Sequence, residues 1–451
     1  MSITLTEEQL AVVTHRLPGH GRVLAGPGTG KSTTSAALAE RLLAEDRPPK
    51  LKFLTFTRAA TAELTTKLAA GQVKVLGRPS TIHSFSISTL LRNPGCASFP
   101  EPLRIPDDFE YETLIRPHLA RRLHVGVKKL DTLVAEMAAM WQSLNPEEHP
   151  SVTPEERARF MGAWLQHRRI SAYTLLSELP DLFRCALRDH DELDGADYDL
   201  LIVDEYQDLN ACDLEVIRRL AGRGASVLAI GDDDQSIYSF RKAHPAGIRR
   251  FLEDYATNYD YKLTICHRSP RRIIEWAQHV IQGDPERENR NPPQYRDDAP
   301  EDVVALLRFR GDKSESRGVA DLVTWLRDAN HLPASEILIL SRTDRSGTFT
   351  RPIKEELSCR GVPISDPSVV EAMISEDENR RLIAHLRLLV DPTDSLAWWS
   401  LLKLQPRVGD GFVDHIFDRA SATNTTFGEA FTAAAKEGFV EAPQGTPKPA
   451  T

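Results

Sequence analysis

The sequence predicts an α/β protein whose parallel sheet is covered by helices on both faces and binds a phosphorylated ligand at its carboxyl edge. Two apolar runs without alternation, Leu200–Val203 and Val227–Ile230, are typical of central strands in such a sheet. Acidic strings follow both runs directly, at 204–208 and 231–238, and a glycine-rich turn occupies 25–32. Because open α/β sheets bind ligands at the carboxyl ends of their strands, we expect these three segments to form one site.

Length and composition are those of a multidomain soluble protein. The 451 residues suffice for roughly two to four domains, and the apolar and charged fractions, 41% and 27%, are ordinary for globular proteins. We find neither an apolar run near the ~20 residues of a membrane span nor a signal peptide at Met1. The sequence therefore predicts a cytoplasmic protein without a membrane partner.

The cysteines and the net charge bear on other classes of protein. Five cysteines are scattered without a CxxC pair, which favours reduced core thiols over a metal site or disulfides. The net charge of -9 argues against a uniformly basic nucleic-acid binder. It permits a local basic track, because phosphate contacts depend on the local field.

Helices and strands alternate at the start of the chain. The expected elements are a helix at 6–14, a strand at 21–25, a helix at 31–44, a strand at 51–56 and a helix at 58–68. From about 86 to 190 the pattern changes to helical periodicity with many Arg and Glu residues and Pro-punctuated joins. We interpret this stretch as a helical insertion between strands of one sheet, since the alternation resumes after Asp199 and continues to about Ile265.

A Pro- and charge-rich stretch, 283–300, separates this part from a second α/β unit. The elements expected beyond it are strand-like Val303–Phe309, helix Arg317–Ala329, strand Ile337–Leu340 and helices at 376–389 and 396–404. The tail, 441–451, is rich in Pro, Gly and Ala, a composition that predicts disorder.

The glycine-rich turn predicts binding of a nucleoside triphosphate. Glycines let backbone N–H groups approach phosphate oxygens, and the N-terminus of the following helix favours negative charge. Lys31 can reach the β- and γ-phosphates, and the Ser32 hydroxyl can ligate Mg²⁺. Ala25 stands where the general phosphate-loop pattern has its first glycine. The glycines that line the turn are Gly26, Gly28 and Gly30.

Two adjacent acids after the first apolar run suit metal-assisted hydrolysis. Asp204 is the candidate for a second Mg²⁺ contact, made through water because Mg²⁺ keeps several of its waters. Glu205 is placed to orient or deprotonate the attacking water. The alternative is that both acids cap a following helix, which is worth only ~1 kcal/mol and leaves the upstream phosphate loop unexplained.

Taken in order along the chain, these motifs resemble those of the UvrD/Rep family of superfamily 1 DNA helicases. The resemblance covers roughly residues 1–420. The matching blocks are Leu5–Gln9, the phosphate loop, Thr55–Ala60, Thr81–Phe85, Asp204–Asn210, Gly231–Arg241 and Cys266–Ser269.

The resemblance implies two RecA-like domains with ATP between them and single-stranded DNA running across the top, along which ATP cycling moves the protein 3′ to 5′. The first RecA-like domain, a P-loop NTPase domain, is implied to comprise 1–85 and 190–265, with an accessory helical insertion at 86–189. A second RecA-like domain, which is incomplete, is implied at 266–390. The start of a second accessory helical domain follows at 391–440, before the disordered tail.

Individual residue roles also come from the resemblance. Gln9 is implied to read adenine, and Gln235 to couple the γ-phosphate to the DNA side, since its amide can donate and accept at once. Arg268 is implied to stabilise charge on the transferred phosphoryl group. The implied catalytic set is Lys31, Asp204, Glu205, Gln235 and Arg268. The implied ATP contacts are Gln9, Gly26, Gly28, Thr29, Gly30, Lys31, Ser32, Thr33 and His267, with Ser32 and Asp204 as Mg²⁺ ligands.

Aromatic and basic residues after the strands are candidates for DNA contact. The aromatic side chains can stack on bases for ~1–3 kcal/mol each, with a core position as the alternative for any one of them. The basic side chains can contact phosphates, with surface salt bridges as the alternative. The full set is Phe56, Thr57, Arg58, His83, Tyr238, Phe240 and Arg241.

The sequence departs from the family pattern in three respects. Thr33 and His267 stand where the family commonly has an Arg and a Tyr that sandwich adenine, which predicts relaxed base selectivity. The last two family motifs are not found after residue 409, and the second sheet therefore lacks strands. A truncated product, a partner chain that supplies the rest and a degenerate relative that uses ATP binding as a switch all remain open.

The leading hypothesis is an ATP-dependent 3′–5′ DNA helicase or translocase that acts on single-stranded DNA and single/double-strand junctions. It fits repair, recombination or defence against foreign DNA. The alternative is a DNA-responsive ATPase subunit that does not unwind alone and needs a partner or a longer chain. A purely structural nucleic-acid binder would leave the hydrolytic acids unexplained.

Overall fold

The protein consists of two compact units. The computed structural model describes residues 4–70, 78–145, 152–237, 246–256, 259–283, 294–341, 347–366 and 368–438. One unit combines residues 1–302 with 381–451, and the other is formed by 303–380. This division by packing crosses the expected 266–390 domain, whose boundaries stay a prediction. The tail at 441–451 lies outside the described residues.

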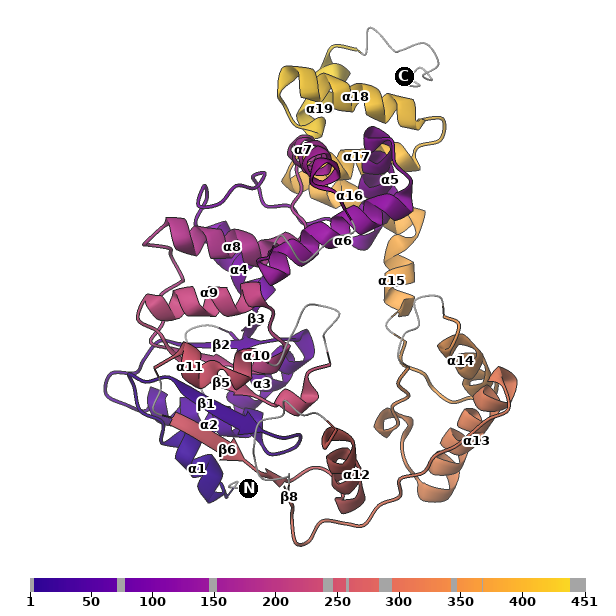
Figure 1. Cartoon of the computed structure of the whole chain (residues 1–451). Helices are drawn as coiled ribbons and strands as arrows, with labels where there is room; N and C mark the ends of the chain where they lie inside the picture. The colour runs from indigo at the N-terminus through magenta and orange to yellow at the C-terminus, as the bar shows by residue number, and fades with distance from the viewer. Residues whose placement is uncertain are drawn as a thin grey trace. The chain divides into compact units, whose positions relative to one another are not determined.

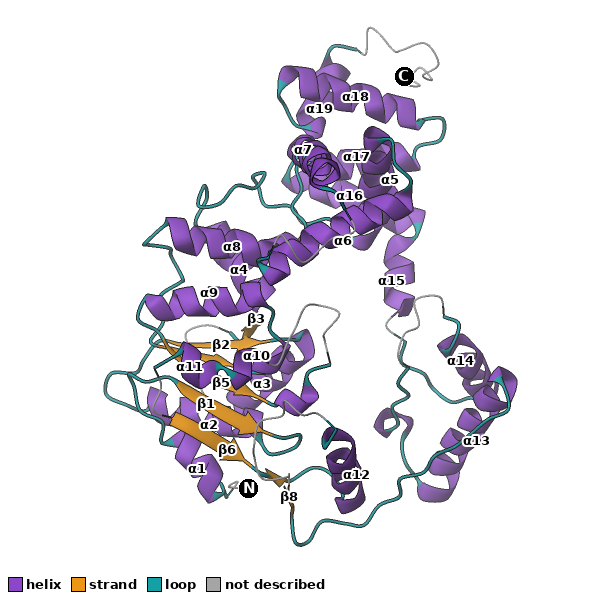
Figure 2. Ribbon diagram, viewed as in Figure 1, coloured by secondary structure: helices purple, strands orange, loops and turns teal. Residues whose placement is uncertain are grey.

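The first unit is built on a six-stranded parallel sheet (Figure 2). Neighbouring strands follow the order β3-β2-β4-β5-β1-β6, and every pair is parallel. The bounds are β1 Gly21–Ala25, β2 Leu51–Thr55, β3 Ser80–Thr81, β4 Leu200–Val203, β5 Ser226–Gly231 and β6 Tyr259–Leu263. The prediction of a parallel α/β sheet is confirmed. A small second sheet pairs β7 Ile265–Cys266 with β8 Gln294–Tyr295.

Successive side chains of β4 enter opposite layers, which explains its continuous apolar run. Leu200 and Ile202 belong to one hydrophobic cluster, whereas Leu201 and Val203 belong to another. All four side chains are at most 1% exposed. A strand covered on both faces needs an apolar residue at every position, since its side chains alternate between the faces.

Helices between residues 7 and 254 cover the two faces of the sheet. One layer consists of α1 (Glu7–Val13), α2 (Lys31–Leu43) and α3 (Arg58–Ala70). The other consists of α4 (Ile82–Arg92), α8 (Leu179–Asp189), α9 (Ala211–Gly222), α10 (Ala246–Arg249) and α11 (Phe251–Asp254). The first and last helices of the expected insertion, α4 and α8, are thus part of the sheet's own layers. A further helix, α12 (Arg271–Ile281), lies between β7 and β8 in the chain.

The remaining helices of the insertion share one core with helices near the C-terminus (Figure 1). A π-helical turn, Glu110–Ile115, leads into α5 (Arg116–Leu123), α6 (Val127–Ser143) and α7 (Pro154–Ser171). These pack with α17 (Ser395–Leu404), α18 (Asp410–Thr423) and α19 (Phe427–Lys436). We call this assembly the helical body, residues 110–175 and 395–436. Its core includes Trp164, Trp399 and Phe427, each at most 3% exposed.

A chain of buried polar contacts crosses the helical body. His118 Nδ1 lies 2.9 Å from His167 Nε2, and His167 Nδ1 lies 3.2 Å from the Tyr173 hydroxyl. On the other side His118 Nε2 lies 3.0 Å from Asp414 Oδ1 of α18. Burial lowers the pKa of His118 to about 4, although Asp414 opposes this shift, and lowers that of His167 well below its usual range. Both imidazoles are therefore neutral at pH 7.

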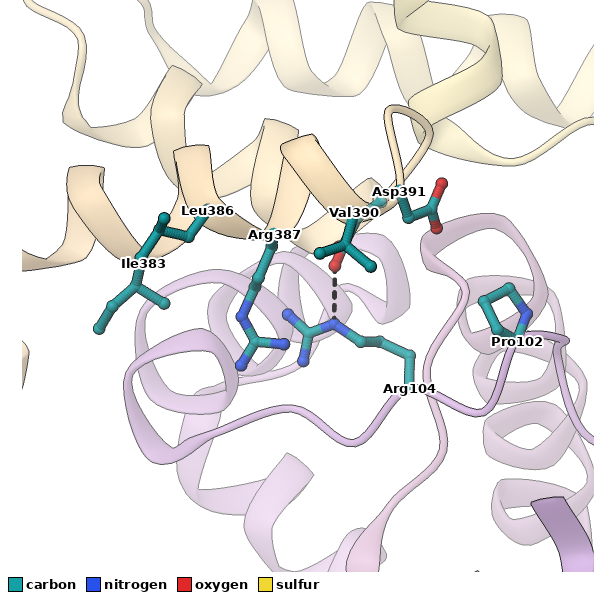
Figure 3. Close-up of a pocket in the computed structure, with 8 residues that line it drawn as sticks. Pro102, Arg104, Ile383, Leu386, Arg387, Val390 and Asp391 are labelled. Atoms are coloured by element: carbon teal, nitrogen blue, oxygen red, sulfur yellow. Dashed lines mark hydrogen bonds and ion pairs between the residues drawn. The ribbon is translucent and has the colours of Figure 1, made fainter.

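A cavity of about 380 Å³ lies beside the helical body, where the 102–104 segment faces α16 (Asp377–Val390) and the turn after it (Figure 3). Arg104 Nε donates to Asp394 Oδ2 at 2.9 Å, and the same guanidinium pairs with Glu110. The lining residues are Pro102, Arg104, Ile383, Leu386, Arg387, Val390, Asp391 and Asp394. None of them follows a strand of the large sheet, so the cavity is separate from the expected site.

The second unit is mainly helical in its described residues. It contains α13 (Asp312–Asn330), a 3-10 turn at Ala334–Glu336, α14 (Thr350–Cys359) and α15 (Ser368–Ser375). Its small core consists of Ala320, Val323, Leu357 and Val362. No described helix of either unit combines the length and apolarity needed to cross a membrane.

The predicted strands Val303–Phe309 and Ile337–Leu340 are wrong, because neither segment pairs with another strand among the described residues. The side chains of Leu306 and Leu340 are 93% and 82% exposed. An apolar run forms a strand only when a neighbouring strand satisfies its backbone N–H and C=O groups. Both segments are apolar, but the described residues supply no strand to pair with them.

We expect acidification to destabilise the helical body through the buried histidines. Above about pH 6.5 both the folded and the unfolded histidines are neutral, so this contribution to stability is fully present. As the pH falls from about 6.5 towards 4, the unfolded chain takes up protons that buried His118 resists, and the contribution is lost. The melting temperature followed by circular dichroism should therefore drop between pH 7.5 and 5.

The double variant His118→Leu/His167→Leu should show a smaller drop over the same pH interval. The matched control is His124→Asn, which changes an exposed histidine whose left-handed backbone Asn tolerates. An equal pH dependence in the wild type and the double variant would contradict this account.

Candidate active site at the carboxyl edge of the sheet

The expected site residues follow different strands but reach the same edge of the sheet. The glycine-rich turn follows β1, Asp204 and Glu205 follow β4, and Gln235 lies in the turn after β5. Because β4, β5 and β1 are consecutive neighbours and all parallel, their carboxyl ends are adjacent. The structure therefore brings these three segments together as predicted from the sequence.

The glycine-rich turn has the backbone geometry of a phosphate cradle. Gly28 and Gly30 adopt left-handed conformations, with φ of 70° and 87°, and α2 begins at Lys31. The Thr29 hydroxyl donates to Gly26 O at 2.9 Å, which closes the turn on itself. Backbone N–H groups at the start of a helix have no partner within the helix, so they are available to an anionic ligand.

Gln9 contacts this turn from α1. Its side-chain Nε2 donates to Thr29 O at 3.1 Å, and its Oε1 accepts from the N–H of Thr6 at 3.0 Å in a capping box. The side chain is 6% exposed. Gln9 thus lies beside the phosphate turn, and both the nitrogen and the oxygen of its side-chain amide are hydrogen-bonded to backbone atoms. Thr33, another residue expected to contact the nucleotide, lies in the first turn of α2 and is half-buried.

Lys31 reaches across the sheet edge to the acidic segment after β4. Its Nζ lies 3.3 Å from Glu205 Oε2. Glu205 adopts a left-handed backbone conformation with φ of 53°, which is uncommon for a residue other than glycine. Its N–H donates to Asp204 Oδ1 at 3.0 Å. The two acids and the lysine thus form one cluster.

Two carboxyl groups here, those of Asp204 and Asp208, have raised pKa values. Burial, reinforced by the neighbouring Glu205 carboxylate, raises the pKa of Asp204 to about 6, with Lys31 opposing the shift. The same causes raise the pKa of Asp208 to about 7, and Asp208 Oδ1 is buried without a hydrogen-bond partner among the described residues. Crowded carboxyls with raised pKa values are stabilised in their ionised form by a cation.

Side-chain hydrogen bonds hold the turn after β5 in place. Gln235 Nε2 donates to Asp232 Oδ2 at 2.6 Å, and Asp232 Oδ1 accepts from the N–H of Asp234 at 3.2 Å. Asp233 Oδ2 accepts from Arg249 Nε at 3.1 Å. The acidic string therefore fixes the turn that presents Gln235.

The segment after β7 closes over the phosphate turn. The N–H of His267 donates to Gly28 O at 2.8 Å. A Cβ added at Gly28 would lie 2.7 Å from Arg268 Cβ and 2.8 Å from Cys266 Sγ. The side chains of His267 and Arg268 are both exposed. The backbone and Cβ of Arg268, the arginine expected to contact the γ-phosphate, therefore lie next to the turn.

The family of the chain follows from two matches to family models. Residues 5–256 match the UvrD/REP helicase N-terminal domain, and residues 261–440 match the UvrD-like helicase C-terminal domain. The chain belongs to the UvrD/REP helicase family. The resemblance predicted from the sequence motifs is confirmed, and the family agrees with a fold of two RecA-like domains.

Named relatives align with most of this UvrD-like chain. The ATP-dependent DNA helicase PcrA of Bacillus subtilis is 25% identical over 434 residues, covering 90% of this chain and 56% of PcrA. The ATP-dependent DNA helicase Rep of Buchnera aphidicola is 24% identical, covering 89% of this chain and 62% of Rep. DNA helicase II of Escherichia coli is 25% identical, covering 87% and 55%. The chain thus spans between 55% and 62% of the length of these relatives.

The residues expected to contact DNA lie on the other half of the same edge. Phe56, Thr57 and Arg58 follow β2, and His83 follows β3, which is paired with β2 at Thr55 and Thr81. Arg58 is exposed and Phe56 is half-buried against the core beneath it. The Thr57 hydroxyl accepts from the N–H of Ala60 at 3.1 Å and so caps α3. Three further candidates, Tyr238, Phe240 and Arg241, lie outside the described residues.

The donor set at the edge fits Mg²⁺. Hard oxygen ligands are available from the Ser32 hydroxyl, which lies 3.5 Å from Glu63 Oε1, and from the carboxylates of Asp204 and Asp208. Asp208 Oδ1 is buried without a hydrogen-bond partner among the described residues, and the pKa values of Asp204 and Asp208 are raised. Both observations indicate a site for a cation. The expected ligands Ser32 and Asp204 therefore suit the metal.

Sequence reasoning missed three residues of this site. Asp208, Gln207 and Asp232 all lie within the acidic strings but were not assigned roles. Gln207 is 1% exposed, and the available signal in the sequence was its position two residues after Glu205 within the acidic string. What the sequence could not give is the contact between the strings, which depends on the strand order.

Replacement of Gly28 by Ala should weaken nucleotide binding. The new methyl group would press against Cys266 and Arg268 and would strain a left-handed backbone. We expect the affinity for a fluorescent nucleoside triphosphate analogue to fall by about tenfold or more, the effect of roughly 1.4 kcal/mol.

The matched control is Gly95→Ala, where φ is also positive at 77° but no atom of the described residues lies within 4 Å of the added Cβ. It carries the same backbone strain without the contact. If both variants bind the analogue as tightly as the wild type, the tight fit between the two segments has no role in binding.

Proposed function

We propose that this chain is an ATP-dependent motor that hydrolyses ATP with Mg²⁺ and moves 3′ to 5′ along single-stranded DNA. The observation that carries the proposal is the ion pair between Lys31 Nζ and Glu205 Oε2, at 3.3 Å, beside the phosphate turn. It joins the residue suited to bind phosphate to the residue suited to activate water. The relatives named as ATP-dependent DNA helicases support the same function.

Each residue at the carboxyl edge of the sheet has its own role in the proposed hydrolysis. Lys31 moves from Glu205 to the phosphates when ATP binds, which frees the Glu205 carboxylate to orient the attacking water. Ser32 and Asp204 hold Mg²⁺, which neutralises charge on the phosphate oxygens. Arg268 stabilises charge on the transferred phosphoryl group, and Gln235 senses it.

Nucleotide recognition is proposed for residues around the turn. The backbone of Gly26, Gly28, Thr29 and Gly30 cradles the phosphates, Gln9 reads the base edge, and Thr33 and His267 lie near the base. Among these, Gln9 already contacts the turn through Thr29 O. His267 can stack on the base because its side chain is exposed.

DNA contact is proposed for the half of the edge formed by β2 and β3. Arg58 and His83 suit phosphate contacts there, and Phe56 suits stacking with a base. Thr57 lies between them in the same loop. Tyr238, Phe240 and Arg241 are proposed as further contacts on the strength of the motif alone. Substrates with a single/double-strand junction fit this motor, as do roles in repair, recombination or defence in the cytoplasm.

The domain organisation is likewise a proposal. We assign residues 1–85 and 190–265 to the first RecA-like domain and 86–189 to an accessory insertion. The incomplete second RecA-like domain is assigned to 266–390. The start of a second accessory domain is assigned to 391–440, with the tail after it.

A second candidate function is favoured by two exposed apolar segments of the second unit. Residues 303–309 and 337–340 expose Leu306, Leu338 and Leu340 by 93%, 78% and 82%. Apolar segments of this kind are normally covered by neighbouring strands. The chain would then be a DNA-responsive ATPase subunit that does not unwind alone and needs a partner or a longer chain to cover these segments.

ATP turnover by the purified chain tests the first proposal. We expect Mg²⁺-dependent hydrolysis that single-stranded DNA stimulates. Lys31→Ala should lower kcat by about 100-fold or more, because a charged group at the phosphates is lost. Glu205→Gln should lower it by a similar factor, because the amide cannot accept the proton of the attacking water.

Lys50→Ala serves as a surface control, since this residue precedes β2 at the opposite end of the strand. Hydrolysis that survives both active-site substitutions would assign the activity to something other than this edge.

An unwinding assay separates the two candidate functions. The motor function predicts that the chain separates a duplex with a 3′ single-stranded tail and fails on one with a 5′ tail. DNA-stimulated hydrolysis without strand separation on either substrate would instead favour the subunit that needs a partner.

A further inference from the structure

Gln207 lies in the 3-10 turn Tyr206–Asp208, directly after the two hydrolytic acids. Its side chain is 1% exposed, so both ends of its amide need partners within the protein. The amide Nε2 donates to Glu205 Oε2 at 2.9 Å. The amide Oε1 accepts from the backbone N–H of Asp232 at 3.0 Å. One side chain thus bridges the segments that follow β4 and β5.

This bridge completes a continuous path of polar contacts from the phosphate turn to the 232–236 turn after β5. Lys31 Nζ contacts the same Glu205 oxygen that accepts from Gln207, at 3.3 Å. On the far side, Asp232 Oδ2 accepts from Gln235 Nε2 at 2.6 Å. The path therefore runs Lys31, Glu205, Gln207, Asp232, Gln235, with each step a direct polar contact.

The shape of the surrounding chain is fitted to this side chain. A Cβ at Gly231 would overlap Gln207 Oε1, so the absence of a side chain there allows the close approach of β5. A second contact runs in parallel, because the Ser236 hydroxyl donates to Gln207 O at 3.3 Å. Gln207 thus contacts both the start and the end of the 232–236 turn.

We propose that Gln207 is a positioning residue that couples the state of the nucleotide, through Glu205, to the turn that carries Gln235. The inference rests on the proposed ATPase function and assigns the regulation of that site. An amide is the side chain suited to this place, because it donates to a carboxylate and accepts from an N–H at the same time. When Lys31 leaves Glu205 for the phosphates, Glu205 is repositioned, and Gln207 transmits the change to Asp232.

Coupling of this kind acts in both directions. Any event that shifts the 232–236 turn from the DNA side must shift the position of Glu205 by the same path. DNA binding would thus stimulate hydrolysis by orienting Glu205, with Gln207 as the connection. This separates Gln207 from a residue that only fills the core, whose loss would lower stability and leave the ratio of DNA-stimulated to basal turnover unchanged.

Hydrogen–deuterium exchange on the full chain tests the coupling without requiring turnover. A non-hydrolysable ATP analogue with Mg²⁺ should protect peptides covering 26–32 and 231–237 in the wild type. In Gln207→Met, a variant of similar volume without hydrogen-bonding groups, protection at 26–32 should remain and protection at 231–237 should be lost. Gln166→Met, an exposed glutamine in the helical body, is the matched control.

Turnover gives a second readout. In Gln207→Met the DNA stimulation of kcat should fall by about tenfold, because both hydrogen bonds of the buried amide are lost, while KM for ATP changes little. If Gln207→Met does not fold, Gln207→Glu is tested in its place, since it keeps the acceptor for Asp232 and removes the donor to Glu205. It should lose the same stimulation.

The outcomes are distinguishable. Nucleotide protection at 26–32 without any response at 231–237 in the wild type, or DNA stimulation that Gln207→Met retains, would overturn the coupling role and leave the ATPase proposal standing. Absence of protection at 26–32 in the wild type would remove the ATPase proposal and this inference with it.

Discussion

Parallel pairing is the constraint on which the candidate site depends. Parallel strands all end at the same edge of a sheet, so the segments after β1, β4 and β5 meet although they are far apart in the sequence. The same pairing requires long crossovers, which here become the helices that bury both faces. Burial then removes water from the acids at the edge, which raises the pKa values of Asp204 and Asp208 and prepares the site for a cation.

Local pattern was enough to predict the sheet and the segments of the site. The unbroken apolar run of β4 indicated burial on both faces, and the glycines at 26–30 indicated a turn against phosphate. The individual side-chain contacts between these segments could not be predicted in this way, because they depend on the order of the strands. Gln207 looks like an ordinary polar residue until β5 is placed beside β4, when its amide is found between Glu205 and Asp232. The roles of the site residues remain predictions.

The apolar segments at 303–309 and 337–340 mark where the same reasoning failed. Hydrophobic sequence predicts which residues prefer burial, but a strand also needs a neighbour for its backbone. For the helical body, by contrast, the helical character was predicted and the packing was not. A helical insertion and a helix at 396–404 were expected, yet the common core of α5–α7 with α17–α19 depends on shape complementarity between distant segments, which periodicity does not reveal.

That common core has a consequence for the synthesis of the protein on the ribosome. Tyr173 and Leu175 emerge about 220 residues before Leu396 and Trp399, which complete their core. At typical elongation rates of about 5–20 residues per second, this interval lasts on the order of ten to forty seconds. During that time α5–α7 lack the part of their core that α17–α19 supply, so the nascent chain exposes apolar side chains to which chaperones can bind and through which it can aggregate.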